Sequence, residues 1–117
     1  MTTVETTFWV WTRNEETEIK PGQVIGKYLF FSDSKELLQK LGEEILKEHK
    51  LPHMKISADR NAGADEGFGY VLCVYSNNSN LRNELKQKEA PGINYRFFKT
   101  DDATRAGIYS KKYKDTQ

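Results

Sequence analysis

The residues best suited to chemistry are two lysines that each interrupt an otherwise apolar row of a predicted strand, Lys27 and Lys99. Their apolar neighbours on the same side of the strand are Ile25, Leu29 and Phe31 in the first case and Tyr95 and Phe97 in the second. Such a lysine needs a partner, a cavity, or a route by which its ammonium group reaches water. Further cations could converge with them if the sheet curls, namely Lys55, Arg60, Arg96 and Arg105. Cations set among aromatic rings would suit the phosphate of a nucleotide or of a phosphorylated peptide.

The second candidate feature is a pair of tryptophans on one predicted strand. Trp9 and Trp11 are two residues apart, so both indoles lie on the same side of the strand, while Phe8 and Val10 lie on the other. If the latter pair faces the core, the indoles line an outer surface where they could stack on a base or contact a cation. In the alternative arrangement the indoles pack beneath the C-terminal segment.

Metal binding and nucleophilic catalysis have weaker support. His49 and His53 are four residues apart, but Pro52 lies between them and should break the helix that would align them. Cys73 lies in an apolar strand, where a free cysteine usually behaves as a small buried hydrophobe. No motif of a serine hydrolase is present. We therefore expect no metal and no cofactor, and we favour binding over turnover.

The C-terminal segment carries the last group of candidates. Thr100, Asp101 and Asp102 can cap a helical turn that delivers Thr104 and Arg105. The glycine and tyrosine that follow, Gly107 and Tyr109, allow a sharp reversal and a further aromatic contact. This segment is either a loop over a pocket or a structural clip, and the residues alone do not decide between the two.

Composition bounds the class of protein. The 117 residues, 37% of them hydrophobic, predict a single domain over 1–117 with flexible termini at 1–6 and 112–117. With 18 Lys+Arg against 17 Asp+Glu, the net charge of +1 argues against a duplex-DNA binder. One cysteine excludes an intramolecular disulfide, and no apolar run approaches the ~20 residues of a membrane span. We expect a cytoplasmic protein that does not enter a membrane.

Hydrophobic periodicity predicts a single α+β domain with a mostly antiparallel sheet and helices on one face. The expected order is β-β-α-β-β-α-β. The predicted strands are 7–13, 23–31, 53–59, 70–76 and 93–100, and the predicted helices are one from Ser34 to before Pro52 and a short one within 81–90. Asp33 and Glu36 have the spacing of a capping box at the start of the first helix. The strand at 23–31 is apolar on both sides, which predicts a central position in the sheet.

Several short blocks of the chain resemble a known family. WVWTRNEE, GKYLFF, MKIS, YVLCVYS and FFKTDDATRAGIYSKKY occur in this order. They resemble small bacterial and archaeal proteins labelled phosphothreonine lyase domain proteins, and also the eukaryotic basophilic leukaemia-expressed protein family. The resemblance implies a fold like that of the mRNA cap-binding initiation factor, a curved antiparallel sheet backed by helices. The lyase label implies β-elimination with a lysine base and several cations on the phosphate.

We expect a small binding module for a nucleotide or other phosphorylated ligand, which could act by sequestering a signalling nucleotide. The predicted ligand-binding residues are Trp11, Lys27, Tyr28, Lys55, Lys99, Thr104, Arg105 and Tyr109. A second copy of the chain could complete the pocket. A lysine-based phosphothreonine lyase and a protein-interaction domain are the alternatives.

Overall fold

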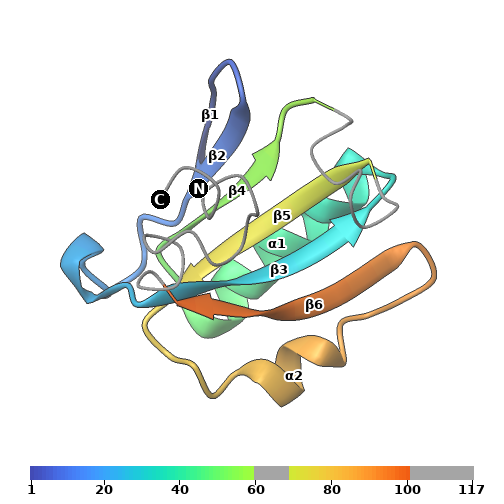
Figure 1. The fold of residues 1–117 in the computed structure, drawn as a ribbon. Coiled ribbons are helices and arrows are strands. Elements are labelled where there is room, and N and C mark those ends of the chain that lie inside the picture. The colour runs from blue at the N-terminus through green and yellow to red at the C-terminus, as the bar shows by residue number, and fades with distance from the viewer. Residues whose placement is uncertain (60–68, 101–117) are drawn as a thin grey trace, which may run out of the picture.

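The computed structural model of the chain describes residues 1–59 and 69–100, which form an antiparallel sheet with two α-helices (Figure 1). The strands are β1 (Thr2–Glu5), β2 (Trp9–Arg13), β3 (Gly26–Ser32), β4 (His53–Ser57), β5 (Tyr70–Ser76) and β6 (Ile93–Thr100). The helices are α1 (Lys35–His49) and α2 (Arg82–Lys86), with a short 3₁₀ turn, η1, at Pro21–Gln23. The strand order is β1-β2-β4-β5-β3-β6, and all neighbours are antiparallel. The predicted α+β class is confirmed.

The strand β3 has the interior position that its sequence predicts. It lies between β5 and β6, and all seven of its residues are buried. Figure 1 shows α1 crossing behind the sheet and α2 beside β6. Both helices contribute to the same apolar cluster, so the prediction of helices on one face is confirmed. The sheet therefore has one face that the helices cover and a second face on which no described helix packs, and we call this second face the open face.

The segment 1–6, expected to be a flexible terminus, contains a strand that the sequence did not predict. All four residues of β1 are exposed, so this strand has no apolar alternation to reveal it. Pairing with β2 holds it in place, from Thr2 opposite Arg13 to Glu5 opposite Val10. The chain thus has three strands before α1, where the sequence predicts two.

The helix α1 begins and ends where expected, but another residue caps it. Ser34 is the N-cap, and its hydroxyl accepts a hydrogen bond from the backbone N–H of Leu37 at 3.2 Å. The carboxylate of Asp33 instead accepts one from the N–H of Gly69 at 2.8 Å. The predicted capping box is therefore wrong. At the other end, Lys50 adopts a left-handed conformation and its N–H donates to the carbonyl of Leu46.

The main core lies between α1 and the sheet. It contains Leu38, Leu41, Ile45 and Leu46 of α1, Leu85 of α2, and strand residues that include Tyr28, Phe30, Met54, Ile56, Leu72, Val74 and Tyr95. Fully burying one such side chain contributes roughly 1.5–3 kcal/mol relative to leaving it in water. This cluster fixes which side of each strand faces α1.

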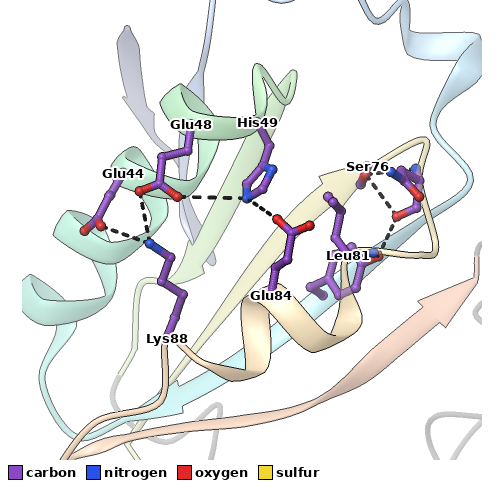
Figure 2. Close-up of polar contacts among 9 residues, drawn as sticks. Glu44, Glu48, His49, Ser76, Leu81, Glu84 and Lys88 are labelled. Carbon is purple, nitrogen blue, oxygen red and sulfur yellow. Dashed lines mark hydrogen bonds and ion pairs between the residues drawn. The ribbon is translucent and has the colours of Figure 1, made fainter.

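A second connection joins α1 to α2 at the surface (Figure 2). Lys88, just after α2, lies 3.0 Å from Glu48 and 3.1 Å from Glu44, and His49 Nε2 lies 3.7 Å from a carboxylate oxygen of Glu84. The hydrogen bond with Glu48 raises the pKa of Lys88, and the same contact lowers the pKa of Glu48. These side chains are partly exposed, so the pairs orient α2 more than they stabilise it.

Two buried tyrosines of the core differ in how their hydroxyl groups are satisfied. The hydroxyl of Tyr28 donates to the carbonyl of Asn78 and accepts from the buried N–H of Leu81 at 3.0 Å, which ties β3 to the start of α2. Burial raises its pKa. The hydroxyl of Tyr95 is buried and has no hydrogen-bond partner among the described residues.

We expect these two tyrosines to respond oppositely to the same substitution. Tyr28→Phe should cost about 1–3 kcal/mol of unfolding free energy because it leaves a buried N–H unsatisfied. Tyr95→Phe should be neutral or slightly stabilising because it removes a desolvated hydroxyl that bonds to nothing. Urea unfolding of both variants measures the difference, and equal losses would contradict the assigned contacts.

Gly42 sets how closely α1 approaches the sheet. A Cβ placed on Gly42 would overlap Met54 Sδ and lie 3.2 Å from Leu72 Cδ1, and both of these side chains are fully buried. Only glycine leaves the room that these side chains of β4 and β5 occupy.

Gly42→Ala should therefore destabilise the protein by up to about 2 kcal/mol. Overpacking costs about 1–3 kcal/mol, and the gain that alanine brings to a helix interior offsets only about 1 kcal/mol of it. Gly22→Ala is the control, because a Cβ there meets nothing within 4 Å. Chemical denaturation should show no loss for the control, and a stable Gly42→Ala variant would refute the close approach.

Candidate functional site

The open face carries an aromatic and lysine cluster, which consists of Trp9, Trp11, Lys55, Tyr75 and Lys27. Strand alternation places these residues on the side away from α1. The register brings them together, since Trp11 lies opposite Lys55 in β4 and Tyr75 of β5 lies opposite Lys27 in β3. Four strands of the sheet therefore contribute to one surface.

Lys55 lies among three aromatic rings. Its Nζ is 3.9 Å from the ring centroid of Trp9, 5.2 Å from that of Trp11 and 5.9 Å from that of Tyr75. The ion pairs found in the described part of the chain involve other cations, so no carboxylate there neutralises Lys55. The ring faces are its nearest electrostatic partners.

The environment of Lys55 changes its acidity. Burial lowers the pKa of its ammonium group, and the like charge of Lys27 lowers it further, whereas Cys73 acts in the opposite direction. The side chain is half-buried, so the group still reaches the surface. An anion bound beside this lysine would stabilise the charged ammonium form that burial disfavours.

Tyr75 connects the two lysines of the cluster. Its ring lies 5.7 Å from Lys27 Nζ and 5.9 Å from Lys55 Nζ. It is nearly parallel to the ring of Trp11, with centroids 6.1 Å apart and an interplanar angle of 20°. The imidazole of His53 lies 4.6 Å from Tyr75 and 5.9 Å from Trp11, so it extends the aromatic surface toward the start of β4.

The rest of the open face is apolar and buried. Leu29, Phe31, Val71 and Cys73 form a second cluster there, against which Trp9 and Tyr75 pack. The prediction that Cys73 is a buried hydrophobe is confirmed, since only 4% of its surface is exposed. Ser57, on the same side of β4 as Lys55, is buried and accepts a hydrogen bond from Val71 N–H at 3.0 Å.

The structure brings together three of the predicted ligand-binding residues, Trp11, Lys27 and Lys55. Tyr28 is fully buried on the opposite face, where its hydroxyl bonds to backbone groups, so its assignment to the ligand site is wrong. Arg96 is exposed on β6. The side chain of Lys99 and the predicted ligand-binding residues at 104, 105 and 109 lie outside the part of the chain that the structure describes, as does the candidate cation at 60.

The predicted apolar row around Lys99 is interrupted by a β-bulge. Tyr28 pairs with Phe98 and Phe30 pairs with Tyr95, so β6 uses one more residue than β3 over this stretch. Tyr95, which lies opposite Phe30, joins the core under α1. The backbone of Lys99 pairs with that of Lys27.

Two members of this surface, Tyr75 and His53, were missed because the sequence shows them in other contexts. Tyr75 belongs to the apolar strand YVLCVYS, whose pattern indicates core packing. His53 has a sequence context that suggests only a possible metal ligand. Alternation alone places Tyr75 with Cys73, but the pairing of β5 with β3 is needed to place it beside Lys27. His49 belongs to the α1–α2 contact, whereas His53 lies beside Trp11 and Tyr75.

No group of three or more potential metal ligands was found among residues 1–59 and 69–100. Within the same ranges, no helix has the length and apolar content needed to span a membrane.

Comparison with known proteins adds no relative, since no protein-family model, curated protein or solved structure matches this chain. The geometry of the open face is therefore the basis on which we infer a function.

Proposed function

We propose that the open face of the sheet binds a small phosphorylated ligand that carries an aromatic ring, with nucleotides as the class that fits best. The observation that carries this proposal is the position of Lys55, which lies among the rings of Trp9, Trp11 and Tyr75 without a described carboxylate partner. On one half-exposed surface, the ammonium group of the lysine matches the phosphate of a nucleotide and the aromatic ring faces match its base.

The charge of the surface supports a ligand with few phosphates. Lys55 and Lys27 are the cations of the cluster, and Lys27 has only 7% of its surface exposed. A phosphate at Lys55 would form a charge-assisted hydrogen bond in a partly desolvated setting, where such bonds are strongest. A polyanion such as duplex DNA needs many more cations along its path.

The aromatic rings supply the second half of the recognition. Each base stacked on an aromatic side chain gains about 1–3 kcal/mol, largely independent of base identity. Trp11 is half-buried, so its position is held by packing while part of its ring remains accessible. Binding without turnover also fits a protein that sequesters a signalling nucleotide, with a second copy of the chain completing the site.

The binding proposal is tested with a panel of linear and cyclic nucleotides in a thermal-shift assay. A ligand at a hundred times its Kd should add about 2.7 kcal/mol of stability to the wild-type protein. Lys55→Gln should weaken binding about tenfold or more because it removes a charge-assisted hydrogen bond. Trp9→Leu should weaken it as well, through loss of the ring beneath Lys55.

Lys40→Gln is the matched control, since Lys40 is exposed on α1, away from the open face, and the substitution makes the same charge change. It should bind as the wild type does. No shift with any nucleotide, or equal losses in Lys55→Gln and Lys40→Gln, would end this proposal.

One observation favours an enzymatic alternative, because burial lowers the pKa of Lys55 and so increases the share of free amine. As a base, Lys55 would take the Cα proton of a phosphothreonine, and the electron pair would form the Cα–Cβ double bond as phosphate leaves.

Mass spectrometry of a phosphothreonine peptide should then detect the dehydrated product and free phosphate. The rate should rise with pH and level off below 10.5, the ordinary pKa of lysine. Absence of product, or product formed equally by Lys55→Gln, would remove this alternative.

A further inference from the structure

A pocket of about 280 Å³ lies beside the aromatic and lysine cluster, at the end of β2 and the start of β4. Trp11 and His53 line it on the side of the cluster, and Ile19, Pro21 and Pro52 supply apolar walls. Arg13, also part of the lining, is exposed, and it takes part in none of the ion pairs found within the described ranges. Trp11 is therefore shared by the pocket and the cluster.

We infer that this pocket receives the heterocyclic ring of the ligand while Lys55 holds its phosphate, which assigns the site to nucleoside monophosphates. The inference rests on the proposed function and deepens it, because it adds a separate ring subsite. Without the pocket, a ring could stack only on the open face itself, where Lys55 already covers the ring of Trp9 at 3.9 Å.

The residues that line the pocket have the chemistry needed to bind a nucleobase. Trp11, Ile19 and the prolines offer flat apolar contacts to the faces of a ring. The guanidinium of Arg13 carries only donors, so it suits the ring nitrogens and carbonyl oxygens that accept hydrogen bonds at the edge of a base. A plain aliphatic guest would leave this cation without a partner.

The size and position of the pocket restrict the guest further. A volume of 280 Å³ is just below the roughly 300–1,000 Å³ of pockets that enclose drug-sized ligands, so the pocket suits one ring system better than a whole nucleotide. Lys55 Nζ is 5.2 Å from the centroid of Trp11, and the His53 ring is 5.9 Å from the same point. The phosphate of a ring bound beside Trp11 would therefore lie within reach of Lys55.

The experiment compares the four common nucleoside 5′-monophosphates with ribose 5-phosphate by NMR titration, which reads weak affinities. The tightest nucleotide should bind the wild-type protein about tenfold more strongly than ribose 5-phosphate, because one stacked ring contributes on that scale. Pro21→Trp, which fills the pocket from an exposed wall, should abolish this tenfold advantage and leave ribose 5-phosphate binding within about twofold.

Gln23→Trp is the control for bulk, since Gln23 is exposed on the same turn and does not line the pocket. It should keep the tenfold advantage. Arg13→Gln serves as a second variant if Pro21→Trp does not fold, and it should reduce the advantage about threefold through loss of the cation that faces the ring edge.

The outcomes separate the two proposals. If nucleotides bind and Lys55→Gln weakens them, but neither pocket variant changes the advantage over ribose 5-phosphate, the ring subsite is refuted and the proposed function stands. If no nucleotide binds the wild-type protein, the proposed function fails and the ring subsite fails with it.

Discussion

The placement of helices on one face of the sheet is the constraint on which the rest of this structure depends. Successive side chains along each strand point to opposite faces of the sheet. Once one set of side chains packs under α1, the residues between them must therefore lie on the open face. Gly42 lets α1 come close enough to bury Met54 and Leu72. The next residues along the same strands, Lys55 and Cys73, are thereby assigned to the open face.

Opposing electrostatic effects meet at Lys55. Burial and the nearby charge of Lys27 disfavour its ammonium form, whereas the negative faces of Trp9, Trp11 and Tyr75 favour it. A half-buried cation held by rings instead of a carboxylate keeps its capacity to pair with an incoming anion. This is the difference between Lys55 and Lys88, whose charge two glutamates already neutralise.

Much of the fold could be read from the chain because its elements follow simple patterns. Alternation and apolar runs located five of the strands, and helical spacing located α1 between Ser34 and Pro52. The strand β1 escaped because an exposed edge strand has no burial pattern, and the cap of α1 was misassigned because Asp33 bonds to a residue far along the chain. Part of the candidate site was foreseen for the same local reason, since Trp9 and Trp11 must share a side of β2.

By itself, the sequence determined the types and approximate bounds of most elements, the shared side of the two tryptophans and the burial of Cys73. Only the tertiary structure decided which lysines and rings meet, because strand order and register join residues far apart in the chain. Register placed Tyr75 beside Lys27, and it placed Tyr95 opposite Phe30 in the core under α1. Packing also sent Tyr28 to the core, since a strand that is apolar on both sides carries no local sign of which side will face the helix.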